Sequence, residues 1–327
     1  MSEAAHIVKQ QLPTTAETHA ALSKVGLFAL VLALVAAPLV ANSYLLYAIA
    51  LCFANSIAIL SVSVLVRYGG EISIGHSVFV GLGAYAVAIV ERHLHVSLIL
   101  GLPVALATGV LAGLAFAYPS RRVTGIYLAV LTMALALSLQ EALLQATSVT
   151  GGFEGLYVSL DLLPGAPKTL QRYYVALAVL ALACLLLARF RGSSYGLALL
   201  AARSHPRAAE AFGVTRSWSR LSVFAISGGL AAIGGAVFAF ASSTVSPNSF
   251  TLWSGIFLLV GSVVSLHGLS LPAALFGGAF VTLIPEYLAG AGDWVPVLYG
   301  VALLVIVLGV NRGSDLRRLI GLGRRAS

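Results

Sequence analysis

The chain has 327 residues, of which 59% are hydrophobic and only 9% charged, and its mean hydropathy is +0.98. A soluble domain of this size needs charged residues along every exposed helix, so this composition excludes a soluble globular fold. The net charge is +8, but the basic residues lie at the ends of apolar segments rather than in one patch interleaved with aromatics. That distribution indicates orientation in a lipid bilayer and argues against nucleic-acid binding.

Apolar runs of about twenty residues, long enough to cross ~30 Å of hydrocarbon, recur along the chain. The ten candidate spans are 24–42, 44–66, 72–91, 96–118, 123–145, 172–190, 219–241, 249–266, 270–289 and 294–310. All are expected to be helices, because lipid offers no partners to backbone amides and the segments lack the alternation of a barrel. The sequence therefore predicts an all-α, polytopic transmembrane bundle of about ten spans.

The two ends of the chain are predicted to be cytoplasmic tails, 1–23 and the basic segment 311–327, on either side of a transmembrane domain over 24–310. The first apolar run lacks a small-residue cleavage pattern, so we expect a retained span rather than a signal peptide. With the N-terminus inside, 16 of the 19 basic residues fall on the cytoplasmic side, and only Arg92, Lys168 and Arg172 fall outside. This bias predicts that both termini are cytoplasmic.

Polar residues in and after the second span suggest a solute path. Asn55 lies within that span, although serines around it commonly bond their own backbone. Residues 69–76 read Gly-Gly-Glu-Ile-Ser-Ile-Gly-His, and Gly-x-Gly-Ala-Tyr follows at 81–85. Two interpretations are open: a broken helix that lines a polar path, or glycines that allow close helix packing. Close packing is the expectation for Gly109, Gly113, Gly228, Gly229, Gly234 and Gly235.

Two connections are too long to be simple turns. The first, 146–171, is expected to face outward and is rich in glycine over 150–156; the second, 191–218, is expected to face the cytoplasm. Within the second, alanine-rich stretches predict two short helices, with Pro206 in the first turn of the latter and Gly213 ending it. This segment is compatible with a helix resting on lipid headgroups or with a small-residue knob that inserts into a soluble partner.

The residues that most enzymes require are missing. The lysines are Lys9, Lys24 and Lys168, and none follows a glycine, so the chain has no phosphate-binding Gly-x-x-x-x-Gly-Lys loop of its own. Neither a nucleophile elbow nor a His-Glu-x-x-His helix is present. His93 and His95 form a His-x-His without a third ligand, and both cysteines fall inside apolar runs. We therefore expect neither an enzyme nor a bound metal or cofactor.

Four stretches, taken together and in order, resemble permease subunits of branched-chain amino-acid ABC importers, the LivM type, over roughly residues 40–310. They are Gly70–Phe79 with Gly81-x-Gly83-Ala84-Tyr85, Gly125–Thr132 with Thr150-Gly151-Gly152-x-x-Gly155-Leu156, Ala208–Gly213, and Ser246-Pro247-x-Ser249-Phe250 with Pro285-Glu286.

The resemblance implies a multi-pass protein of the bacterial inner membrane with several partners. These are a second permease subunit, a solute-binding protein outside, and two cytoplasmic ATPases that use the ATP and grip a loop like 195–213. Carried onto this chain, the coupling residues would be Arg203, Ala208, Ala209, Glu210 and Gly213. Glu71, Ser73, His76 and Tyr85 would lie near the solute path, with Asn55 as a further candidate.

The chain departs from the family pattern in two places. A family run like Gly-Gly-x-Gly-Ser-x-x-Gly-Pro corresponds here to residues 266–274, Leu-His-Gly-Leu-Ser-Leu-Pro-Ala-Ala, and an acidic residue common in the fifth span is replaced by Leu137, with Glu141 one turn on. The solute therefore stays open between branched-chain amino acids and other small polar molecules such as urea or amides. The alternative function is an ion-coupled secondary transporter, which would need mid-membrane carboxylates and repeated discontinuous helices. A purely structural membrane protein would need neither long loop.

Overall fold

The computed structural model describes residues 15–94, 98–120, 123, 125–159 and 165–288, with the isolated positions 294, 297, 300, 301 and 304. The chain divides into two compact units, Met1–Ser43 and Tyr44–Ser327. In the first unit, α2 (Thr15–Ala36) continues into the short helix η1 (Ala37–Leu39). The helix thus begins within the segment 1–23 that was predicted to be a tail. Its apolar part, Val25–Leu39, is shorter than a full span.

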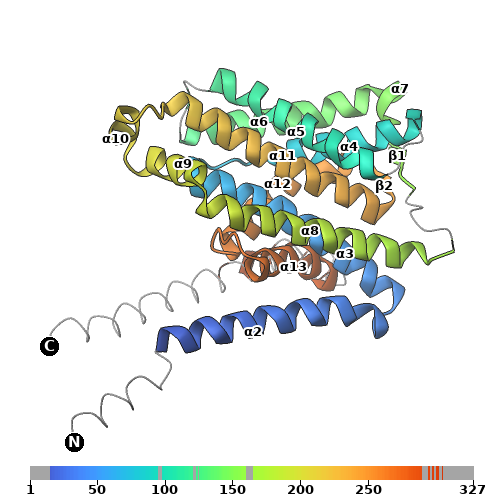
Figure 1. The fold of residues 1–327 in the computed structure, drawn as a ribbon. Coiled ribbons are helices and arrows are strands. Elements are labelled where there is room, and N and C mark those ends of the chain that lie inside the picture. The colour runs from blue at the N-terminus through green and yellow to red at the C-terminus, as the bar shows by residue number, and fades with distance from the viewer. Residues whose placement is uncertain are drawn as a thin grey trace, which may run out of the picture. The chain divides into compact units, whose positions relative to one another are not determined.

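The second unit is built almost entirely of helices (Figure 1). Its longer helices are α3 (Ser43–Val64, continued by the π-helical turn η2, Leu65–Gly69), α4 (Ser77–Leu94), α5 (Leu98–Ser120), α6 (Ile126–Gln145), α8 (Lys168–Gly192), α11 (Arg216–Ser242), α12 (Leu252–Val264) and α13 (Leu271–Leu288). Its shorter elements are α7 (Thr147–Thr150), β1 (Leu156–Tyr157), α9 (Ser194–Ser204), α10 (Pro206–Ala211), β2 (Thr244–Val245) and η3 (Pro247–Phe250).

Among the described residues, five helices are long and apolar enough to cross a membrane. They are Ser43–Gly69, Gly101–Ser120, Tyr127–Gln145, Lys168–Gly192 and Arg216–Ser242. The segments expected at 72–91, 249–266 and 270–289 also form helices, but shorter ones. The segment 294–310, the tail 311–327 and His95 lie outside the described residues, apart from the isolated positions. The helical fold is therefore confirmed, whereas the number of ten spans stays a prediction.

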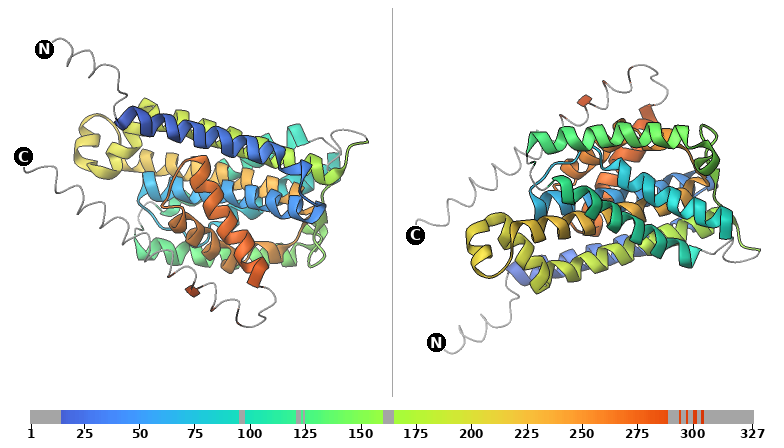
Figure 2. Two further views of the ribbon diagram at one scale, coloured as in Figure 1. Left: turned by 90° about the horizontal axis from the view of Figure 1, so that it is seen from below. Right: turned by 90° about the horizontal axis from the view of Figure 1, so that it is seen from above.

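Helix α11 forms the buried centre of the second unit. It packs along α5 and α4 on one side and contacts α8 on another (Figure 1 and Figure 2). The crossing with α5 is close because Gly109 and Gly228 meet: a Cβ added to Gly228 would lie 2.5 Å from the Gly109 carbonyl oxygen. The expected role of these glycines in close helix contact is confirmed.

The described residues directly after α6, 146–159, are held by hydrogen bonds. The Thr150 hydroxyl donates to the Leu143 carbonyl at 2.7 Å, and β1 pairs antiparallel with β2, Leu156 opposite Val245. The pairing was not predicted, because two-residue strands are too short to show an alternating pattern. Figure 1 places α7, β1 and β2 at one end of the unit and α9 and α10 at the other.

The two short helices predicted between α8 and α11 are present as α9 and α10. Ser193 caps the first, since its hydroxyl accepts a hydrogen bond from the Gly196 amide at 3.1 Å. Pro206 is the first residue of α10, where its missing N–H costs no helical hydrogen bond. Gly213 follows with φ +83°, a left-handed conformation that ends the helical segment.

Candidate functional site

A stretch without helical structure, residues 70–76, separates the end of η2 from the start of α4. Gly70 ends the preceding helix with φ +68°, and its amide donates to the Val66 carbonyl. Further on, the Ile74 amide donates to the Thr132 hydroxyl at 3.1 Å. A Cβ on Gly75 would lie 1.8 Å from the Thr132 carbonyl oxygen, so this backbone lies directly against α6. Both open interpretations of 69–85 therefore hold in part: the helical structure breaks at 70–76, and Gly75 and Gly83 pack closely, since a Cβ on Gly83 would lie 2.1 Å from the Ala232 carbonyl oxygen. That the stretch lines a polar path stays a prediction.

His76 is the last residue of this stretch, and its side chain is fully buried. Its Nε2 lies 2.9 Å from the Ser61 hydroxyl on α3 and 3.3 Å from the Ser227 hydroxyl on α11. Ser227 in turn donates to the Ser61 carbonyl at 2.9 Å. Within the described part of the chain, His76 Nδ1 and the buried hydroxyls of Ser73 and Ser77 have no hydrogen-bond partner. Buried polar groups are normally paired, so this stretch differs from ordinary helix packing.

A cavity of about 230 Å³ opens beside the start of α4. It is lined by Asn55, Ser77, Val80, Phe238, Ser249, Phe250, Ser254, Phe257, Leu258, Val281 and Pro285. The Asn55 amide donates to the Thr282 hydroxyl at 2.9 Å, so its orientation is set by α13. Hydroxyls and an amide face aromatic rings across the cavity, a lining suited to a small solute with both polar and apolar parts.

The predicted path residues do not all meet at this cavity. Asn55 lines it, whereas Tyr85 packs edge-on against Phe250, a lining residue, with ring centres 6.2 Å apart. Ser73 and His76 lie in the adjoining buried stretch. Ser254 and Phe257 were missed, because nothing in their local pattern distinguishes them from ordinary span residues.

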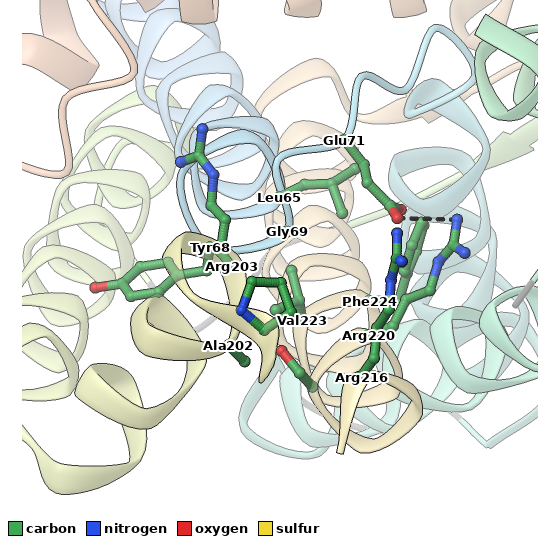
Figure 3. A pocket seen from close by; sticks show the side chains of 12 residues that line it. Leu65, Tyr68, Gly69, Glu71, Ala202, Arg203, Arg216, Arg220, Val223 and Phe224 are labelled. Carbon is green, nitrogen blue, oxygen red and sulfur yellow. Dashed lines mark ion pairs between the residues drawn. The ribbon is translucent and has the colours of Figure 1, made fainter. Parts of the chain in front are cut away.

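Glu71 lies in a different pocket, of about 150 Å³, between the end of α3 and the start of α11. Its carboxylate pairs with Arg220 at 2.9 Å, and Arg216 lies beside it in the same pocket (Figure 3). Burial raises the pKa of Glu71, while the Arg220 guanidinium opposes that rise. The residue grouped by sequence with the solute path thus contacts the base of α11, directly after α9 and α10.

The predicted coupling residues gather around α9 and α10. Arg203 reaches from α9 to donate a hydrogen bond to the Arg67 carbonyl. Ala209 is buried between the two short helices, whereas Ala208, Glu210 and Gly213 are exposed. Ala208 and Glu210 also line a shallow hollow with His205, Arg207 and Arg216. This end of the unit therefore offers a small-residue surface with charged side chains around it.

No metal-binding arrangement accompanies these pockets in the described residues. No three histidine, cysteine, aspartate or glutamate side chains gather there in a way that could hold a metal ion.

Comparisons with known proteins agree with this geometry. The sequence model described as "Branched-chain amino acid transport system / permease component" matches residues 43–310. The high-affinity branched-chain amino acid transport system permease protein LivM of Escherichia coli strain K12 is 25% identical over 256 residues, and that of Salmonella typhimurium strain LT2 is 26% identical over 255 residues. Each match covers 70% of this chain and 60% of the relative's length, and no solved structure matches. Since the family model spans most of the chain, including both pockets, the protein belongs to the family of branched-chain amino acid transport system permease components.

Proposed function

We propose that this chain is the permease subunit of an ABC importer in the bacterial inner membrane and forms half of the path for a branched-chain or related amino acid. The observation that carries the proposal is the cavity beside Asn55 and Ser77, which adjoins the broken stretch 70–76; the turn η2 before that stretch accepts a hydrogen bond from Arg203 of α9. Its hydroxyl and amide groups suit the polar end of an amino acid, and its phenylalanines suit an apolar side chain.

The proposed topology has about ten spans with both termini in the cytoplasm. The tails 1–23 and 311–327 and the connection 191–218 would then be inside, and the connection 146–171 outside. The concentration of arginine on one side of the membrane supports this orientation. So does the separation of α7, β1 and β2 from α9 and α10 at opposite ends of the second unit (Figure 1).

The proposed partners are two cytoplasmic ATPases, a second permease subunit and an extracytoplasmic solute-binding protein. The ATPases would grip α9 and α10, where Ala208 and Glu210 are exposed and Gly213 ends the helical segment. Arg203 and Ala209 would hold this docking element on the membrane helices. ATP would be used by the partners alone.

Transport in vesicles tests the function. This chain is co-expressed with the second permease subunit, the ATPases and the solute-binding protein. The complete complex is reconstituted into liposomes and supplied with labelled leucine. We expect uptake that requires ATP and disappears when the ATPases carry a substitution that blocks hydrolysis. Uptake by this chain alone, driven by a proton or sodium gradient, would show a secondary transporter instead.

A further inference from the structure

The Glu71–Arg220 ion pair joins two parts of the chain that the proposed function sets in relative motion. Glu71 is the second residue of the broken stretch 70–76, and Arg220 lies in the second turn of α11, just after α9 and α10. Their closest atoms are 2.9 Å apart, and the two side chains are only 13% and 7% exposed. Figure 3 shows both reaching into one pocket from opposite sides.

The pair has further anchors. The same Arg220 guanidinium donates to the Val123 carbonyl at 2.6 Å, just before α6 begins. Removing two charges from water raises the free energy about as much as their mutual attraction lowers it. A buried ion pair therefore adds little net stability over apolar side chains. Its distinctive effect is to hold one relative position of α11, the broken stretch and the start of α6.

A second contact, made by Arg203, lies at the start of the stretch 70–76. Arg203 of α9 donates to the Arg67 carbonyl and lies across Gly70, where an added Cβ would be 3.1 Å from the Arg203 Nε. Helix α9 thus holds the end of α3, while α11 holds Glu71. Helix α9 is part of the α9–α10 segment on which the ATPases are proposed to act, and α11 follows that segment directly in the chain.

From Glu71 the contacts continue to the cavity. Ile74 bonds to Thr132 on α6, and His76 bonds to Ser61 and Ser227 on α3 and α11. The next residue, Ser77, lines the cavity. Because residues 70–76 have no internal helical hydrogen bonds, they can change direction at the backbone without unwinding a helix.

We propose that the Glu71–Arg220 pair is the positioning link through which movement of α9 and α10 resets the stretch 70–76 and the cavity wall at Ser77. The inference rests on the proposed function and adds to it: neither residue touches the solute, and both act on its path through the backbone that they hold.

The test measures how many solute molecules enter per ATP hydrolysed in the reconstituted complex. Glu71→Gln removes one charge at constant size, and Arg220→Gln removes the opposite charge with a shorter side chain. We expect ATP hydrolysis and co-purification of the ATPases to persist while uptake per ATP falls about tenfold. The double variant should be no worse than Arg220→Gln alone, because Arg220→Gln already removes the interaction with Glu71 together with the contact to the Val123 carbonyl. Glu154→Gln, on an exposed loop residue at the other end of the unit, is the matched control and should leave the ratio unchanged.

The ratio separates coupling from folding, since loss of folded protein lowers uptake and ATP hydrolysis together. Arg220→Lys keeps the positive charge and should retain most of the wild-type uptake per ATP hydrolysed. This variant therefore tests the link even if Arg220→Gln folds poorly. An unchanged ratio in Glu71→Gln, or additive losses in the double variant, would overturn the link while wild-type transport stays ATP-driven. Wild-type uptake without ATP would instead refute the proposed function and the link with it.

Discussion

Replacing Gly228 by alanine probes a close helix crossing in the second unit, that of α11 with α5. The added Cβ would lie 2.5 Å from the Gly109 carbonyl oxygen, whereas such atoms prefer about 3.5 Å, so the helices would have to separate by roughly 1 Å. Overpacking of this kind costs about 1–3 kcal/mol, and the better helix propensity of alanine offsets up to about 1 kcal/mol of it. We expect a net loss of about 1–2 kcal/mol in the free energy of unfolding.

The neighbouring glycine provides the control. A Cβ on Gly229 would meet the methyl groups of Leu106 and Val110 at 2.9 and 3.0 Å, and these flexible side chains can rotate away. Gly229→Ala should therefore cost clearly less than Gly228→Ala. The assay is reversible denaturation of the purified protein in mixed detergent micelles, followed by circular dichroism. Equal losses for the two variants, or no loss for Gly228→Ala, would refute the argument that backbone contact limits this crossing.

Three further substitutions test separate parts of the molecule. Glu210→Arg reverses an exposed charge on α10 and should sharply reduce co-purification of the ATPases without affecting membrane insertion; unchanged co-purification would contradict the docking role. Leu266→Gly should raise the free energy of unfolding by about 0.5–1 kcal/mol. Leu266 is 64% exposed and held at φ +56°, a backbone conformation that is strained for leucine but not for glycine. A destabilised variant would show that the contacts of the Leu266 side chain matter more than this strain. Asn55→Leu removes the hydrogen bond to Thr282 and a polar group from the cavity wall. It should raise the solute concentration for half-maximal uptake about five- to tenfold, equivalent to about 1–1.4 kcal/mol, and uptake equal to that of the wild type would exclude this cavity from the path.

Several features follow from local rules and were predicted correctly. Pro206 and Gly213 bound α10 because a missing N–H and a tolerated positive φ act within one turn of chain. The break before α4 was left open by the sequence, although Gly69 and Gly70 carry the same kind of signal. Leu266 and His267 stand where the family pattern expected in the sequence analysis has two glycines. Both have positive φ here, a backbone conformation that favours glycine.

Other features depend on contacts between distant segments and were not available from the pattern. Glu71 was placed by sequence near the solute path, yet its partner is Arg220, which no local periodicity links to it. The cavity wall likewise combines α3, α4, α11, α12 and α13. Which side chains of an apolar helix face a cavity is set by how the helices rotate against one another.

The sequence by itself determined that the chain enters a membrane as helices, where the short helix α10 begins and ends, and which family it resembles, because hydrophobic length and backbone preference are properties of neighbouring residues. Only the tertiary structure decided that the broken stretch is held by α9 and α11 at one end and meets the cavity at the other. That arrangement arises from close packing of helices and from pairing of buried charges, and both depend on residues far apart in the chain.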